Sequence, residues 1–267
     1  MSDRFLTALP VYNEVGHVHD VLAEVRRYSP EILVVDDGST DGTSKLLESE
    51  PGIHVVRHPT NRGYGAALHS AFEFAQRQGY QTLVTIDCDG QHQPCRIPKF
   101  VAACTNCDIA SGSRYLEKFP GDSEPPEQRR RINEQLTAEI NRRLGLHLTD
   151  AFCGFKGYRV AALPHLAVTE TGYAMPLEVW VRAARGGLRV RELAVPLIYL
   201  DEKRSFGGSL DDAATRLKYY YDVLDRVMAT VDGESAANIA APPSMIETQA
   251  AIEQQPARTG ANCGPCA

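Results

Sequence analysis

Two carboxylates, Asp87 and Asp89, stand one residue apart at the end of an apolar run, and both can reach one hard cation. Mg²⁺ and Mn²⁺ take oxygen ligands, commonly a carboxylate or two together with phosphate oxygens. A divalent ion held there would neutralise the charge on a departing diphosphate group. The same triplet occurs by chance as a solvated turn after a strand. The residues around it therefore decide its meaning.

Polar residues also follow three other expected strands, at Asn13-Glu14, Asp36-Asp37 and Ser113-Arg114. In open α/β sheets the ligand crevice lies beyond the carboxyl ends of the strands. We therefore predict that these clusters converge with Asp87 and Asp89 on one site. The alternative for each turn is that its polar residue caps the following helix. Capping and ligand binding can both occur at the same turn.

The order of elements predicts the fold class. Strands and helices alternate through the first half of the chain, which predicts βαβ units and a parallel sheet. The expected strands are Arg4–Pro10, Ile32–Val35, His54–Arg57, Thr82–Ile86 and Asp108–Ser111. The expected helices are Val15–Tyr28, Ser39–Glu50, Gly63–Gln78 and Pro98–Ala103. The second half predicts helices at Glu127–Leu144, Pro176–Ala184 and Leu210–Val231, with a strand over Leu188–Tyr199.

The composition narrows the class of protein. The 267 residues are 43% hydrophobic and 23% charged, which suits one large α/β domain with an appendage. The formal net charge of -6 gives no support for nucleic-acid binding. No apolar run reaches the roughly 18 residues of a membrane span, and no signal peptide is visible. We expect a cytoplasmic protein, with peripheral contact to the inner face of the membrane left open.

Six motifs in order carry a resemblance to a known family. They read LPVYNE, VVDDGSTDGT, NRGYGAAL, DCDGQHQP, GSRY and TDAFCGFKGYR. Together they resemble the family 2 glycosyltransferases of GT-A fold, and within them the dolichyl- and polyprenyl-phosphate sugar synthase branch. The likeness runs from about Phe5 to Tyr221. It implies a GT-A domain over residues 1–231 with a Rossmann-like, mixed but mainly parallel sheet and helices on both faces. Residues 232–267 are expected to be a disordered tail.

The resemblance also implies an activity. It is the inverting transfer of a sugar from a UDP- or GDP-sugar to a phosphate or hydroxyl acceptor, with polyprenyl phosphate at the membrane surface among the acceptors. The resemblance implies that Asp87 and Asp89 hold a divalent cation, Mg²⁺ or Mn²⁺. It also implies that Gln91 and Arg114 are catalytic residues. The donor-binding residues it implies are Pro10, Tyr12, Glu14, Asp37, Asp87, Arg204 and Ser209. The acceptor-binding residues it implies are Arg114, Arg130 and Arg131.

The chain departs from the family pattern on the acceptor side. Arg130 and Arg131 are followed by Ile132-Asn133-Glu134, which puts an acid where the polyprenyl branch is basic. Tyr64 stands where a lysine is common in the family.

The need for a general base depends on the acceptor. A phosphate is already ionised near neutral pH and needs only arginines to place it. A hydroxyl needs a base. Asp150 is the preferred candidate for that catalytic role because its position in the family faces the sugar, and Glu178 is the second. The alternative for Asp150 is a cap on the following turn.

Two other classes of protein, and two further sequence features, were weighed against this resemblance. A sugar-nucleotide nucleotidyltransferase needs a glycine-rich loop after its first strand, yet no glycine occurs there before Gly16. A catalytically silent binding protein would be expected to lack Asp87 or Asp89. The pairs Cys104/Cys107 and Cys263/Cys266 have no role in the family pattern. The amphipathic helix Leu210–Val231 predicts packing on the sheet, a homodimer face or membrane docking.

Overall fold

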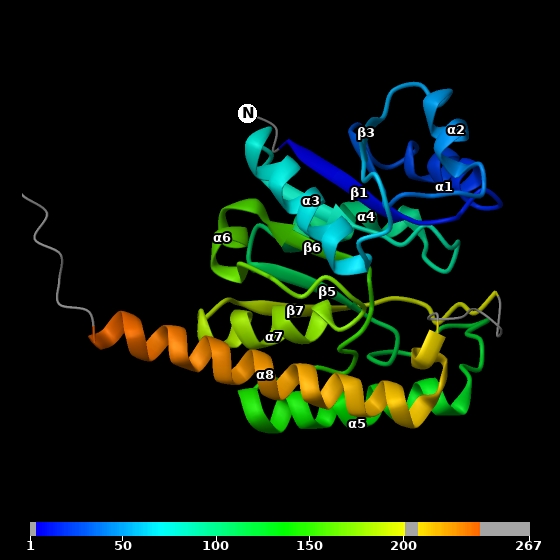
Figure 1. The fold of residues 1–267 in the computed structure, drawn as a ribbon. Coiled ribbons are helices and arrows are strands. Elements are labelled where there is room, and N and C mark those ends of the chain that lie inside the picture. Colours follow the sequence, from blue (N-terminus) through cyan, green and yellow to red (C-terminus); the bar gives the residue numbers. More distant parts are fainter. Residues whose placement is uncertain (1–3, 201–207, 241–267) are drawn as a thin grey trace, which may run out of the picture.

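The computed structural model describes residues 4–200 and 208–240, and the side chains of the last helix as far as residue 234. Its centre is a twisted sheet of order β3-β2-β1-β4-β6-β5-β7, with helices on both faces (Figure 1). The strands are β1 (Phe5–Val11), β2 (Ile32–Asp36), β3 (His54–Arg57), β4 (Thr82–Thr85), β5 (Ile109–Ser113), β6 (Lys156–Arg159) and β7 (Val190–Ala194). The mixed, mainly parallel sheet predicted from the sequence is confirmed.

Only β6 runs against its neighbours among the described strands. It pairs antiparallel with β4 on one side and with β5 on the other, and the remaining pairs are parallel. Its residues lie in the TDAFCGFKGYR motif, for which the sequence predicted no strand. The position of β6 between β4 and β5 brings the segment that leads into β6 beside the carboxyl end of β4.

Two apolar cores cover the two faces of the sheet. Alternate residues of β2 point to opposite sides, so Leu33 and Val35 enter one core while Ile32 and Val34 enter the other. The first core contains α3 (Tyr64–Arg77), α5 (Glu127–Leu144), α6 (Leu163–Leu166), α7 (Met175–Arg185) and α8 (Ala213–Ala240). The second contains α1 (Val18–Val25), α2 (Thr43–Glu48) and α4 (Ile97–Ala103).

The last helix differs from its prediction in length and in partners. α8 continues to Ala240, so the boundary predicted at residue 231 does not end it; residues 241–267 lie outside the described part. It packs on α7 and α5 and runs beside α5 rather than on the sheet (Figure 1). Packing within the chain buries its apolar side chains Tyr220, Val223, Leu224, Val227 and Val231. A homodimer through this helix stays a prediction.

Other boundaries shift for local reasons. The strand expected over Leu188–Tyr199 is the shorter β7, which pairs with β5 as far as Ala194, before Pro196. Short 3-10 turns precede α4 and α6. Among the described residues, none of the helices has both the length and the apolar character needed to cross a membrane.

Candidate active site

A cavity of about 530 Å³ lies where the carboxyl ends of β1, β2, β4 and β5 meet. Residues that follow each of these strands line it, so the predicted convergence of the strand-end clusters is confirmed. The lining residues that the sequence had singled out for the site are Pro10, Tyr12, Glu14, Asp37, Asp87, Asp89, Gln91 and Arg114. Ser209 lies outside this lining, on the exposed turn Gly208–Asp211, and Arg204 falls outside the described residues.

The two candidate metal ligands stand at the carboxyl end of β4. Asp89 Oδ1 accepts a hydrogen bond from the backbone of Gln91 at 3.0 Å, which tightens the turn after the strand. The Asp87 carboxylate accepts a hydrogen bond from the Tyr64 hydroxyl at 3.1 Å and lies 3.3 Å from His92 Nε2. Burial and the nearby Asp87 raise the pKa of Tyr64, so this phenol stays a neutral donor.

The close approach of Gly154 to Asp87 explains a glycine in the segment before β6. A Cβ at this position would lie 2.1 Å from Asp87 Oδ2. The Thr85 hydroxyl donates to the Gly154 carbonyl at 2.9 Å, and the Trp180 indole donates to Ala151 O at 2.9 Å. Strand β4 and helix α7 thus fix the segment that borders the Asp87 carboxylate.

Asp37 forms hydrogen bonds within the chain and also lines the cavity. Its carboxylate accepts the backbone N–H groups of Arg62 and Gly63 at 2.9 and 2.8 Å and contacts His58 Nδ1 at 2.6 Å. The side chain is almost fully buried. Asp37 therefore holds the loop that leads into α3, and it also lines the cavity.

Asp150 and Arg114 form an ion pair beside the cavity, and the Asp150 carboxylate is fully buried. Arg114 Nε and Nη2 donate to the two carboxylate oxygens at 2.6 and 2.9 Å, and the amide of Asn133 donates to Oδ1 at 2.8 Å. Burial would raise the pKa of Asp150, but the Arg114 charge and these hydrogen bonds outweigh it and hold that pKa below its ordinary value. Asp150 is fully buried and absent from the cavity lining.

This geometry argues against the predicted role of Asp150 as a general base. A base must reach the proton it removes and have a pKa suited to accepting it. Asp150 is enclosed, and its carboxylate is committed to Arg114. It fits the role of an anchor that orients Arg114, which itself lines the cavity. Glu178, the second candidate base, lies away from the cavity.

The predicted acceptor arginines need correction by one position. Arg130 and Arg131 are exposed and pair along α5 with Glu134 and Glu127, and neither lines the cavity. Arg129 lines it instead, with its guanidinium 5.8 Å from the centre of the Tyr199 ring. Arg129 precedes the cavity-lining residues Ile132 and Asn133 by three and four positions, so it lies on their face of α5.

The sequence did not identify several residues that line the cavity. These are Tyr115, Asn133, Phe152, Tyr199, Arg216 and Tyr220. A signal was present for Arg216 and Arg129. Arg129 extends the buried stripe of Ile132 and Leu136 on α5 by one turn, and Arg216 precedes buried Tyr220 by one turn on α8.

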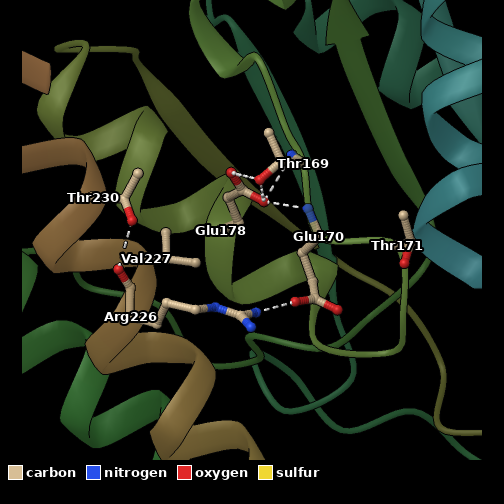
Figure 2. Close-up of a pocket in the computed structure, with 7 residues that line it drawn as sticks. All are labelled: Thr169, Glu170, Thr171, Glu178, Arg226, Val227 and Thr230. Atoms are coloured by element: carbon tan, nitrogen blue, oxygen red, sulfur yellow. Dashed lines mark hydrogen bonds and ion pairs between the residues drawn. The ribbon is translucent and has the colours of Figure 1, made fainter.

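A second hollow of about 440 Å³ separates α8 from the loop before α7 (Figure 2). Figure 2 shows Arg226 reaching toward Glu170, and Glu178 accepting hydrogen bonds from the backbone of Thr169 and Glu170. The Glu178 carboxylate also pairs with Arg182 at 2.7 Å. These groups tie the loop to α7 and α8. Their carboxylates are engaged within the chain, so this hollow is a structural network.

Comparison with known proteins identifies the family. The family model described as glycosyl transferase family 2 matches residues 7–166. The chain belongs to this family. Its sequence is 32% identical over 227 residues to an undecaprenyl-phosphate mannosyltransferase of Micrococcus luteus, covering 80% of this chain and 92% of the relative. It is 33% identical over 215 residues to a polyprenol monophosphomannose synthase of Mycolicibacterium smegmatis, covering 76% and 79% of the two chains.

Solved structures share the fold. A glucosyl-3-phosphoglycerate synthase from Mycobacterium tuberculosis, in complex with UDP, superposes with a TM-score of 0.66 at 18% identity, over 85% of this chain and 81% of the other. The fold is thus that of GT-A glycosyltransferases. The family and the named relatives make this chain a glycosyltransferase that uses a nucleotide-sugar donor.

Proposed function

We propose that this glycosyltransferase moves a sugar, with inversion, from a nucleoside-diphosphate donor to the phosphate of a polyprenyl monophosphate. The observation that carries the proposal is the division of the cavity into two halves of opposite character. Asp37, Asp87 and Asp89 line the donor half, while Arg114 and Arg129 line the acceptor half. By name, one of the relatives is an undecaprenyl-phosphate mannosyltransferase and another is a polyprenol monophosphomannose synthase, so both names join mannose to a polyprenyl phosphate. Mannose is therefore the first sugar to test.

The donor half fits a divalent cation. Asp87 and Asp89 both line the cavity, and the Asp87 side chain is 27% exposed. Among the described residues no three His, Cys, Asp or Glu side chains cluster as a complete metal cage. That suits Mg²⁺ or Mn²⁺, which binds through one or two carboxylates and completes its ligands with phosphate oxygens and water. The bound cation would neutralise charge on the departing diphosphate. Related synthase structures hold Mn²⁺ or Mg²⁺ together with UDP.

The chain's own residues place the two substrates. Asp37 fixes the loop before α3, and Tyr12 and Glu14 border the nucleotide end of the cavity. Gln91 follows the Asp89 turn toward the diphosphate. Arg114 is held by Asp150 and directs its guanidinium at the acceptor phosphate. Guanidinium groups recognise phosphate oxygens with paired hydrogen bonds, which gives geometric specificity as well as affinity.

The reaction then needs no general base. The second ionisation of a phosphate monoester has a pKa of about 6, so the acceptor oxygen carries its negative charge at neutral pH. That oxygen attacks the anomeric carbon from the side opposite the diphosphate, and the configuration inverts. The cavity thus does what the chemistry requires: it neutralises the leaving group at one end and orients an already ionised nucleophile at the other.

The location follows from the acceptor. A polyprenyl phosphate keeps its chain in the lipid bilayer, so the cavity must open toward a membrane surface for transfer to occur. We propose peripheral association with the cytoplasmic face.

Donor binding is tested by thermal denaturation with GDP and UDP, each with and without Mn²⁺. A nucleotide at one hundred times its dissociation constant is expected to stabilise the fold by about 2.7 kcal/mol. The shift should require Mn²⁺ and shrink in Asp89→Asn. Stabilisation by neither nucleotide, or an equal shift in Asp89→Asn, would remove the proposed donor site.

A further inference from the structure

We propose that Arg216, on the last helix α8, binds the acceptor phosphate together with Arg129 of α5. This inference rests on the proposed function, and it adds a phosphate-binding residue that comes from a different element than the predicted arginines. It also accounts for a departure of the sequence. The stretch after Arg131 carries Glu134 where the polyprenyl branch is basic, and α8 supplies a positive charge to the same cavity.

The position of Arg216 supports this role. It lies in the first turns of α8, far from α5 in the sequence, yet its side chain lines the same cavity as Arg114 and Arg129. α5 and α8 pack against each other, which brings the two helices to the acceptor half from the same side. Tyr220, one turn further along α8, lines the cavity beside it. The α8 face that carries Arg216 is therefore a wall of the substrate cavity.

Burial and a hydrogen bond to the backbone hold the Arg216 side chain in place. Arg216 is only 4% exposed. Its Nη1 donates to the carbonyl oxygen of Leu210 at 2.6 Å, at the turn that precedes α8. An arginine fixed in this way loses little further conformational freedom when it binds a ligand. Preorganised donors of this kind are what phosphate recognition requires.

Electrostatics explains what the cavity gains from an anion. Burial lowers the pKa of Arg216, and the nearby positive charge of Arg129 lowers it further, while Tyr220, Asp211 and Asp212 offset part of this shift. Two guanidinium groups at one cavity repel each other, and a desolvated charge is costly. A phosphate dianion between the two arginines would offset their mutual repulsion and the cost of their desolvation. The arrangement therefore favours a ligand with two negative charges over a neutral hydroxyl acceptor.

A purely structural role predicts something different. If Arg216 only ties the Leu210 turn to α8, its loss should loosen the cavity as a whole. Nucleotide binding and phosphate binding would then weaken together, and the melting temperature would fall. If Arg216 binds the acceptor phosphate, the loss is confined to phosphate ligands.

The experiment measures two equilibria in the full chain by calorimetry. The first is binding of farnesyl monophosphate, and the second is binding of GDP or UDP with Mn²⁺. The variants are Arg216→Gln, which removes the charge, and Arg216→Lys, which keeps it. The matched control is Arg142→Gln on α5, whose exposed side chain pairs with Glu139 away from the cavity. Melting temperatures verify folding, and farnesol serves as the ligand without phosphate.

Arg216→Gln is expected to weaken farnesyl monophosphate binding by about 10- to 100-fold, as for loss of a charged hydrogen bond. Nucleotide and farnesol binding should not change, Arg216→Lys should retain part of the affinity, and Arg142→Gln should match the wild type. Equal farnesyl monophosphate binding in Arg216→Gln and wild type would overturn the inference, as would a parallel loss of nucleotide binding. If the wild type binds nucleotide with Mn²⁺ but no farnesyl monophosphate, the proposed acceptor fails and the inference fails with it.

Discussion

Arg114 and Asp150 form a buried ion pair in which both oxygens of the carboxylate receive a guanidinium N–H, at 2.6 and 2.9 Å. Arg114 follows β5, and Asp150 precedes the segment that enters β6. Glu192 of β7 accepts the backbone N–H of Asp150 at 3.1 Å, so three neighbouring strands fix the pair. These bonds hold the Arg114 guanidinium at the proposed acceptor half of the cavity, and they leave Asp150 the role of holding it.

Removing the carboxylate should therefore cost stability as well as activity. Asp150→Ala leaves the Arg114 charge without its partner, and breaking a buried pair in this way costs about 3 to 5 kcal/mol. Chemical denaturation measures the change. The control is Glu134→Gln, whose exposed pair with Arg130 should contribute no more than about 1 kcal/mol. Equal, small changes for both variants would contradict a buried anchor.

The pH dependence separates an anchor from a base. Because folding lowers the pKa of Asp150, its contribution to stability is complete above the unfolded value of about 3.9 and is lost as the pH falls through the folded value. Asp150 therefore stays ionised across the neutral range and gives the rate no titration there. An acid limb of kcat/KM near pH 6 should instead belong to the acceptor phosphate.

That assignment is checked with two acceptors of different acidity, a prenyl phosphate and the corresponding prenyl phosphonate. The limb should move with the acceptor's own second pKa. A limb that stays at the same pH for both acceptors would assign the titration to the protein and revive a general base.

The contact between Gly154 and Asp87 gives a third prediction. In Gly154→Ala the new methyl group would lie 2.1 Å from Asp87 Oδ2, so the carboxylate must move. A displacement of this size at the reacting centre is expected to lower kcat by about 100-fold. The control is Gly16→Ala, where the added group meets open space and should leave transfer unchanged. Normal turnover in Gly154→Ala would show that the position of Asp87 is not critical.

The network in the second hollow predicts a change in stability alone. Glu178→Gln keeps the shape of the side chain but removes the more buried of the two carboxylate partners of Arg182; the other is the more exposed Glu234, at 3.2 Å. We expect a loss of about 3 kcal/mol in unfolding free energy with the donor KM unchanged. Loss of transfer without loss of stability would give Glu178 the catalytic role that its position outside the cavity argues against.

The convergence of the acidic clusters on one cavity could be predicted from the sequence because each cluster depends only on the strand before it. Each acidic cluster directly follows a β-branched or apolar strand, and parallel strands bring their carboxyl ends to one edge. Asp37 and Asp87 needed no tertiary information to be placed together. The sequence could not reveal that Asp37 uses its carboxylate on the Arg62–Gly63 backbone, because that bond joins segments distant in the chain.

The residues of the proposed acceptor half were harder to predict because tertiary packing determines which of them reach the cavity. Which of the three consecutive arginines of α5 faces the cavity depends on how Ile132 and Leu136 dock, and the family register pointed to Arg130 and Arg131. Strand β6 is four residues long and contains Gly157, so periodicity could not identify it. Without β6 in its place, the approach of Gly154 to Asp87 has no sequence signature.

A partition assay measures the proposed transfer of a sugar to a phosphate-bearing polyprenol. Radiolabelled GDP-mannose and UDP-sugars are incubated with Mn²⁺ and either undecaprenyl monophosphate or undecaprenol, and the label in the lipid phase is counted. We predict label only with the monophosphate, abolished by EDTA and by Asp87→Asn. Transfer to undecaprenol at an equal rate, or full transfer in EDTA, would contradict the account.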